Sequence, residues 1–134
     1  MRVVVDPNVI ISGLLSPAGT PARLLAAWQE GRFELLVSPR LVAEVGRALA
    51  YPKLRRRLNA EDADAAVQWL SRDARWVDDL VSAGPIRSED PNDDYLITLA
   101  ADARAALVSG DRHLLRLADR IPVYTPAAFL ASLR

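Results

Sequence analysis

Two acidic residues each follow a short apolar segment at the point where that segment ends. Asp6 comes directly after three valines, and Asp111 follows the segment 106–109 after one glycine. Short apolar runs rich in β-branched residues are typical of strands buried on both faces of a sheet. Because ligands of open parallel sheets bind at the carboxyl ends of the strands, both positions favour a catalytic or metal-binding role. The alternative for Asp6 is that it only caps the next helix.

Two further acids, Glu44 and Asp93, lie near the apolar side of predicted helices. Glu44 is at the edge of the apolar stripe of its helix rather than on the opposite face. Asp93 also leans toward the apolar side of its helix, whereas Asp94 is expected to point about a third of a turn away. Taken alone, Glu44 is explained by a solvent-facing position and Asp93 by a capping box that complements the helix dipole.

Together these acids indicate a site, because carboxylates gathered at one sheet edge repel each other and raise one another's pKa. A hard divalent ion relieves that repulsion, and Mg²⁺ or Mn²⁺ prefers oxygen ligands with several waters retained. A site of carboxylates and waters suits phosphodiester hydrolysis, in which metal ions activate water and neutralise charge on the phosphate.

The elements that must position these acids alternate between strand and helix along the chain. Strands are predicted at 3–5, 33–37, 106–109 and 121–124, with a short fifth segment at 75–77, and helices at 9–11, 20–28, 39–49, 61–72, 90–103, 114–117 and from 125 onward. This alternation predicts right-handed crossovers and a parallel sheet covered on both sides. We therefore expect a single α/β domain over 1–134, a three-layer α/β/α sandwich with a mainly parallel sheet of four to five strands.

Composition narrows the class of protein and of partner. The 134 residues are 51% hydrophobic, with 17 basic and 17 acidic side chains and no cysteine. The balanced charge gives no overall attraction to nucleic acid, so such a partner must bind a local patch. The lack of cysteine excludes disulfides and thiolate chemistry. With no apolar run of signal-peptide or membrane-span length, we predict a cytoplasmic protein without a membrane segment.

The motifs, in this order and at this spacing, resemble those of the PIN domain, the nuclease fold of VapC-like toxins. The resemblance covers essentially the whole chain and is closest to small bacterial PIN proteins of toxin–antitoxin systems. It is carried by the segments 4–12, 36–39 with Glu44 beyond, 90–94 and 107–111.

The resemblance implies a metal-dependent endoribonuclease that uses Mg²⁺ or Mn²⁺ and acts on RNA. Its acidic quartet would be Asp6, Glu44, Asp93 and Asp111, with Asp94 as the alternative third acid and Asn8 and Ser109 as supporting residues. It also implies a cognate antitoxin protein as partner and a homodimer.

Two positions depart from the family pattern. Pro7 stands where threonine is common, and His113 stands where a further aspartate often occurs. His113 is therefore a candidate for phosphate contact or proton transfer, although a surface position is the commoner role of such a histidine. The other candidates for substrate binding are Arg40, Arg47 and Arg112. The basic run at 53–57 is more typical of a solvated face, and the three tryptophans of core or interface positions.

Two other functions compete with the nuclease. A phosphatase of the haloacid-dehalogenase type also begins with an apolar strand ending in aspartate, but it needs a second aspartate where this chain has Asn8. A non-catalytic binding module with the same fold is favoured by the departures at Pro7 and His113.

Overall fold

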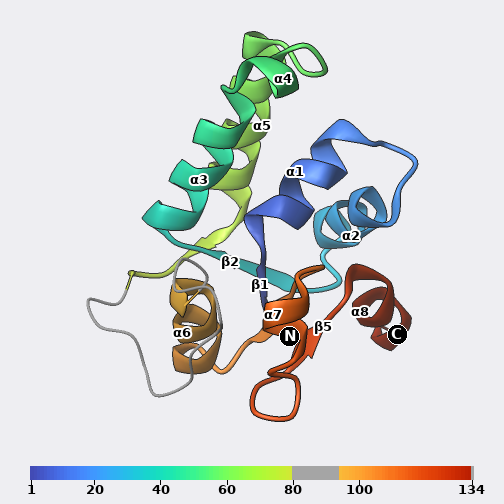
Figure 1. Cartoon of the computed structure of the whole chain (residues 1–134), viewed down its shortest axis with the longest axis vertical. Helices are drawn as coiled ribbons and strands as arrows, with labels where there is room; N and C mark the ends of the chain where they lie inside the picture. Colours follow the sequence, from blue (N-terminus) through green and yellow to red (C-terminus); the bar gives the residue numbers. More distant parts are fainter. Residues whose placement is uncertain (80–93, 134) are drawn as a thin grey trace.

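The structure, a computed structural model, describes residues 1–79 and 94–133. Its strands are β1 (Arg2–Val5), β2 (Glu34–Val37), β3 (Arg75–Trp76), β4 (Ala106–Val108) and β5 (Val123–Tyr124). Its helices are α1 (Pro7–Leu15), α2 (Thr20–Gln29), α3 (Pro39–Leu49), α4 (Pro52–Arg55), α5 (Ala60–Asp73), α6 (Asp94–Asp102), α7 (Arg112–Leu115) and α8 (Pro126–Ser132). Strands and helices alternate as the sequence predicts (Figure 1).

The sheet has five strands in the order β3-β2-β1-β4-β5, and each neighbouring pair is parallel. The central strand β1 pairs Val3 with Leu35 of β2 on one side and with Ala106 of β4 on the other. Its three valines are at most 1% exposed. The prediction of a buried first strand in a parallel sheet is confirmed, and the short segment at 75–77 does form the fifth strand.

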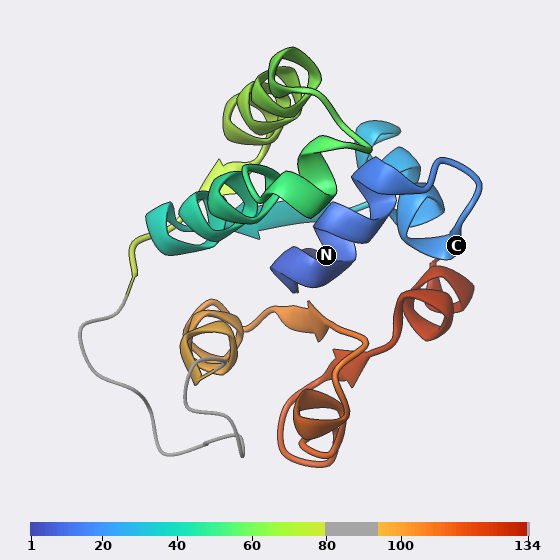
Figure 2. The ribbon, with the colours of Figure 1, turned by 45° about the horizontal axis from the view of Figure 1, so that its top comes forward.

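The strand order changes direction at β1. From β1 the chain crosses outward to β2 and β3, and then returns to β4 and β5 on the other side of β1. Because crossovers are right-handed, the helices of the first half and the helices α6 and α7 cover opposite faces of the sheet. Figure 2 shows this division, with α1 to α5 on one side and α6 and α7 on the other. The carboxyl ends of β1 and β4 therefore meet at a topological switch point, where open α/β sheets bind ligands.

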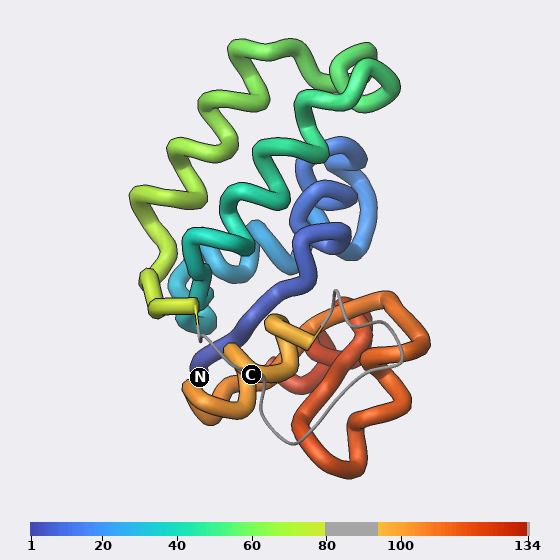
Figure 3. The backbone as a smooth tube through the Cα atoms, turned by 60° about the vertical axis from the view of Figure 1, so that its left-hand side comes forward, coloured from blue at the N-terminus to red at the C-terminus, as the bar shows by residue number. Residues whose placement is uncertain are grey.

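Helices α3 and α5 pack side by side and extend away from the sheet (Figure 3). The basic run that joins them begins in the short helix α4, since Pro52 provides a favourable first helical position. Beyond α4, the Arg57 guanidinium donates to the Leu15 carbonyl at 3.2 Å and to the Ser16 hydroxyl at 3.3 Å. Arg57 thus ties this end of the helix pair to the loop after α1.

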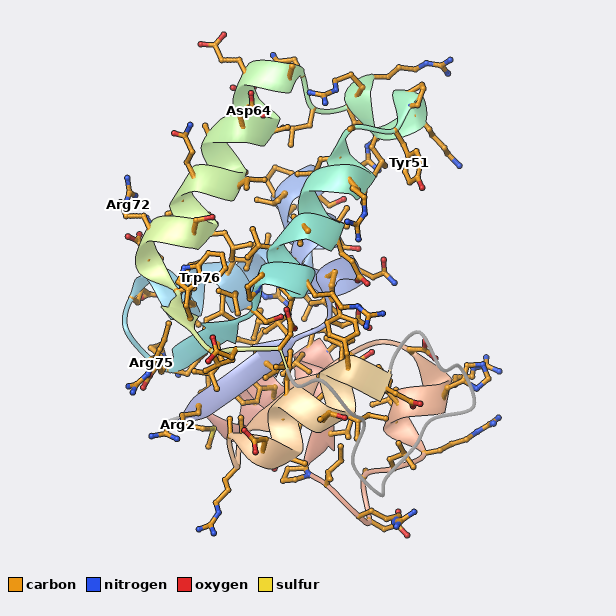
Figure 4. All side chains as sticks on the ribbon, turned by 90° about the vertical axis from the view of Figure 1, so that its left-hand side faces the viewer. Arg2, Tyr51, Asp64, Arg72, Arg75 and Trp76 are labelled. Atoms are coloured by element: carbon orange, nitrogen blue, oxygen red, sulfur yellow. The ribbon has the colours of Figure 1, made fainter. Side chains whose placement is uncertain are left out.

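Two of the three tryptophans confirm the core interpretation. Trp28 of α2 is 7% exposed, and its ring centroid lies 4.8 Å from that of Trp69 on α5. Trp76 is an exception, because its side chain lies at the surface of the edge strand β3 with 44% exposure (Figure 4). Its indole nitrogen donates to the Ser71 carbonyl at 2.8 Å. Trp76 therefore covers the end of α5 rather than filling the core.

Helices α1 and α2 approach each other closely at Gly13. A Cβ atom there would lie 2.7 Å from Leu25 Cδ1 and 3.0 Å from the Pro21 carbonyl oxygen, so only glycine fits without a shift.

Among the described residues, no single helix has the length and apolar character to cross a membrane. Only α1 and α2 together pass such a test, and a bend of 98° separates them.

Candidate active site

Asp6 lies where β1 ends and α1 begins, and it is 4% exposed. Its backbone amide donates to the Val108 carbonyl of β4 at 2.9 Å, so the residue is still part of the sheet. Its Oδ1 accepts a hydrogen bond from the Asn8 amide at 3.0 Å, which makes Asp6 the N-cap of α1. The capping role that was the alternative explanation is real, but it occupies only one of the two carboxylate oxygens.

The second oxygen of Asp6 connects it to the end of β4. Ser109, which is 0% exposed, donates its hydroxyl to Asp6 Oδ2 at 2.7 Å. The same hydroxyl oxygen accepts from the Asp111 amide at 3.0 Å, and Asp111 Oδ1 accepts from the His113 amide at 2.8 Å as the N-cap of α7. Ser109 therefore joins the two acids that follow β1 and β4. We call Asp6 and Asp111 the strand-end pair, and Ser109 is the serine that joins them.

The strand-end pair is electrostatically strained. Burial raises the pKa of the Asp6 carboxyl above its ordinary value, and the nearby Asp111 charge adds to the increase. The hydrogen bonds from Asn8 and Ser109 act in the opposite direction without cancelling it. A cation between the two carboxylates would relieve this repulsion.

Glu44 lies on α3, the helix that follows β2 on the other side of β1. Its Oε2 accepts a hydrogen bond from the Tyr95 hydroxyl at 2.8 Å. The Arg40 guanidinium lies 4.2 Å from the Tyr95 ring centroid, and Arg40 Nε is 4.0 Å from Glu44 Oε1. The Glu44 side chain is 32% exposed, so it lies at the edge of the buried stripe as the helical spacing predicts. Glu44, Tyr95 and Arg40 are hereafter the helix-borne triad.

Tyr95 was not among the site residues predicted from the sequence. Burial raises the pKa of the Tyr95 phenol far above its usual range, and the hydrogen bond to Glu44 and the Glu44 charge raise it further. The Asp6 charge adds a smaller contribution to the same increase in pKa. Tyr95 directly follows Asp94 in the chain, and this adjacency to a predicted acid is the one signal that could have drawn attention to it.

The described candidate for the third acid is Asp94, at the start of α6. Asp94 is the first residue of that helix and is only 8% exposed, although its helical phase was expected to turn it away from the apolar side. That expectation is wrong, because helical periodicity describes the face on which a residue lies and not what surrounds it at the first turn. Asp93, preferred from the sequence, lies outside the described residues.

The remaining predicted residues lie around these groups. Asn8 is exposed and contributes its backbone amide to Asp6. Arg47 is exposed in the last turn of α3, three residues after Glu44. Arg112 is exposed and His113 half-buried in the first turn of α7, next to the capping Asp111. Their roles toward a substrate stay predictions.

The start of α3 is held by a second acid that the sequence did not single out. Asp79, after β3, accepts a hydrogen bond from the Arg40 amide at 2.8 Å through its Oδ2. Ser38 caps the same helix by accepting from the Leu41 amide at 3.2 Å. These two contacts fix the helical turn that carries Arg40 and, one turn later, Glu44.

The donor set is of the type that hard divalent cations prefer, since it consists of carboxylate and hydroxyl oxygens without sulfur ligands. Within residues 1–79 and 94–133, however, no three acidic or histidine side chains converge closely enough to hold one ion. The residues fit Mg²⁺ or Mn²⁺ by the type of their ligand atoms, which are oxygens.

A cavity of about 450 Å³ opens beside the strand-end pair. Asp6, Asn8, Ser12, Gly110 and Asp111 form part of its lining. A larger cavity of about 750 Å³ lies at the other end of the strands, near Phe33 and Trp69, and contains none of the predicted site residues. We take the smaller cavity as the functional one because it adjoins the buried carboxylates at the switch point.

Comparison with known families assigns this architecture. The model of the PIN domain matches residues 2–113, and the chain belongs to the PIN domain family. The chain is also 30% identical over 120 residues to the uncharacterized protein MJ1680 of Methanocaldococcus jannaschii, which covers 89% of this chain and 76% of that protein. The phosphatase alternative is left without support.

Solved structures share the fold at low sequence identity. A chain of the crystal structure of VapBC2 from Rickettsia felis, bound to a DNA fragment from its promoter, matches with a TM-score of 0.64 and 13% identity, covering 92% of this chain and 97% of that one. A chain of FitAcB from Neisseria gonorrhoeae matches with a TM-score of 0.55 and 19% identity, covering 93% and 98%. These matches confirm the predicted α/β sandwich as a PIN-like fold.

Proposed function

We propose that this PIN domain protein is a metal-dependent endoribonuclease that hydrolyses RNA phosphodiester bonds. The observation that carries the proposal is the link from Asp6 through Ser109 to Asp111, which fixes two carboxylates at the switch point of the sheet. Membership of the PIN family and the resemblance to VapC-like toxins support it.

The cation would be held by Asp6, Asp111 and an acid from the start of α6, which is Asp94 or Asp93, with Glu44 completing the set. When bound, Mg²⁺ or Mn²⁺ supplies an activated water and neutralises charge on the phosphate. The protein's own contribution is to hold the carboxylates in place.

Ser109 and the Asn8 amide orient Asp6. Arg40, whose side chain is 46% exposed, would meet a phosphate of the substrate.

Cleavage of a single-stranded RNA of mixed sequence tests this function. The wild-type chain should cleave with Mg²⁺ or Mn²⁺ and stop when EDTA is added. Asp6→Asn should slow cleavage by roughly 10²–10³-fold, the loss typical when a preorganised charged group of an active site is removed. Asp64→Asn, on the exposed side of α5 (Figure 4), is the matched control and should cleave normally. An Asp6→Asn protein that cleaves like the wild type would refute the proposal.

A catalytically degenerate binding module is the second candidate, and one observation favours it: no three described acidic or histidine side chains converge on one point. Calorimetric titration with Mn²⁺ separates the two functions. A nuclease should take up Mn²⁺ and lose that uptake in Asp6→Asn, whereas a binding module should show no uptake that depends on the carboxylates.

We further propose that the protein acts in the cytoplasm as the toxin of a toxin–antitoxin pair, with a cognate antitoxin as partner, and that it forms a homodimer. The resemblance to VapC-like toxins and the fold shared with a VapBC2 chain support the partner. Expression of the wild type, but not of Asp6→Asn, should arrest growth, and co-expression of the adjacent reading frame should restore it. Light scattering measures the oligomeric state.

A further inference from the structure

The helix-borne triad joins the two helical layers. Tyr95 comes from α6 and Glu44 from α3, which cover opposite faces of the sheet (Figure 2). The Tyr95 hydroxyl donates to Glu44 Oε2 at 2.8 Å, a contact between residues 51 positions apart. Arg40 lies over the Tyr95 ring, with 4.2 Å from its guanidinium carbon to the ring centroid. One side chain therefore contacts both a predicted metal ligand and a predicted phosphate-binding residue.

These contacts are better explained by the orientation of Glu44 and Arg40 than by a contribution to the stability of the fold. The ion pair between Arg40 and Glu44 is 4.0 Å long, and the two side chains are 46% and 32% exposed. Such a pair contributes little to folding, because water screens it. The Tyr95 hydroxyl, by contrast, fixes Glu44 Oε2 at 2.8 Å, while Oε1 has only the long, partly exposed pair with Arg40. Partners of this kind set the direction of a metal ligand and commonly change metal affinity 10–100-fold when removed.

We propose that Tyr95 is a positioning residue with two separable roles. Its hydroxyl orients Glu44 toward the divalent cation, and the face of its ring holds Arg40 where the guanidinium meets a phosphate of the RNA. The inference rests on the proposed nuclease function and adds a residue that links metal binding to substrate binding.

The two roles depend on different atoms, so two substitutions separate them. Tyr95→Phe removes the hydroxyl and keeps the ring under Arg40. Tyr95→Leu removes both the hydroxyl and the aromatic face. Tyr51→Phe is the matched control, because Tyr51 is 65% exposed at the far end of α3 and loses the same hydroxyl (Figure 4).

The experiment measures Mn²⁺ affinity by calorimetry and, separately, the affinity for a single-stranded RNA oligonucleotide by fluorescence anisotropy in EDTA. We expect Tyr95→Phe to weaken Mn²⁺ binding about 10-fold and to leave RNA affinity unchanged. Tyr95→Leu should weaken Mn²⁺ binding equally and RNA binding about 3–5-fold, the range expected when one cation–π contact near the surface is lost. Tyr51→Phe should match the wild type in both measurements.

A double substitution tests whether Tyr95 acts through Glu44. Once Glu44→Gln has removed the charged ligand, adding Tyr95→Phe should change Mn²⁺ affinity less than about 2-fold, because contacts that act as a unit are not additive. A further large loss would overturn the proposal. If Tyr95→Leu fails to fold, as judged by circular dichroism, Arg40→Gln replaces it for the RNA measurement and should give the same loss.

The outcomes distinguish this inference from the function on which it rests. A wild-type chain that neither binds Mn²⁺ nor cleaves RNA overturns both. A wild type that does both, together with a Tyr95→Phe variant of unchanged Mn²⁺ affinity, overturns only the role of the hydroxyl. A Tyr95→Phe variant that loses as much RNA affinity as Tyr95→Leu shows that the roles are not separable, and overturns the inference.

Discussion

The strand-end pair and the helix-borne triad are built by different means. Asp6 is held by the sheet, by its capping hydrogen bond and by a buried serine, all within a residue or two of a strand. Glu44 is held by a tyrosine and an arginine through side chains that remain partly exposed. The first arrangement is set by backbone geometry, and the second by side-chain contacts between α3 and α6, which lie on opposite faces of the sheet.

The two arrangements differ in how firmly they hold their charged groups. Groups fixed by backbone contacts to buried strands can hold like charges close together, because the sheet resists their separation. Groups carried on long side chains from two helical layers can adjust when a cation or a phosphate arrives. We expect substitutions in the strand-end pair to affect both stability and activity, and substitutions in the helix-borne triad to affect mainly ligand binding.

The largest effect that separates the two halves is expected from Ser109→Ala. The hydroxyl of Ser109 is buried and serves Asp6 and the Asp111 amide at once, so its loss leaves two polar groups without this partner. We expect a loss of about 1–3 kcal/mol in the free energy of unfolding and roughly 10–100-fold in cleavage rate. Urea unfolding and the RNA assay measure the two quantities.

Asn59→Ala is the control for Ser109→Ala. It removes another capping side chain, which accepts from the Asp62 amide at 2.8 Å at the start of α5. A loss of about 1 kcal/mol in stability is expected, without a change in the rate of cleavage by the folded protein. Equal losses of activity in both variants would mean that Ser109 acts only through folding.

A smaller effect of opposite sign is expected from Asp6→Asn on stability. Because burial raises the pKa of the Asp6 carboxyl, its contribution is fully favourable below the unfolded pKa and is lost as pH rises through the folded pKa. At neutral pH without metal, Asp6→Asn should therefore raise the melting temperature, because asparagine has no charge to bury and still offers its Oδ1 to the Asn8 amide.

The pH dependence checks the cause of that stabilisation. The advantage of Asp6→Asn over the wild type should shrink as the pH falls and disappear below the ordinary carboxyl pKa of 3.8, where the wild-type carboxyl is protonated in both states. Glu44→Gln should show no comparable stabilisation, because Glu44 is partly exposed and already has Tyr95 and Arg40 as partners. Calorimetric melts in EDTA across this pH range would contradict the comparison if the two variants behaved alike.

The smallest effects are expected from the arginines of α3. Arg40→Gln and Arg47→Gln should each weaken RNA binding several-fold and lower the slope of log affinity against log salt by roughly 1, since each removes one phosphate contact. Their melting temperatures should stay within about 2 °C of the wild type, as surface substitutions usually do. If salt slopes are unchanged in both, the substrate does not cross this face of α3.

The location of Asp6, Ser109 and Asp111 at strand ends could be predicted from the neighbouring residues. Three valines followed by an acid, and a second apolar run followed by Ser109 and Asp111, predict strand ends with polar groups, because burial on both faces leaves no other place for such runs. The sequence also predicted the parallel sheet, since strands and helices alternate and crossovers share one hand. The position of Glu44 at the edge of its apolar stripe followed from helical periodicity.

The contacts of the helix-borne triad could be seen only in the folded structure. The contact between Tyr95 and Glu44 joins residues 51 positions apart on two helices, and no local pattern specifies it. The burial of Asp94 was missed for the same reason, because periodicity describes one face of a helix and not what encloses its first turn. Local chemistry is written in neighbouring residues, whereas contacts between layers depend on how the whole sheet brings α3 and α6 together.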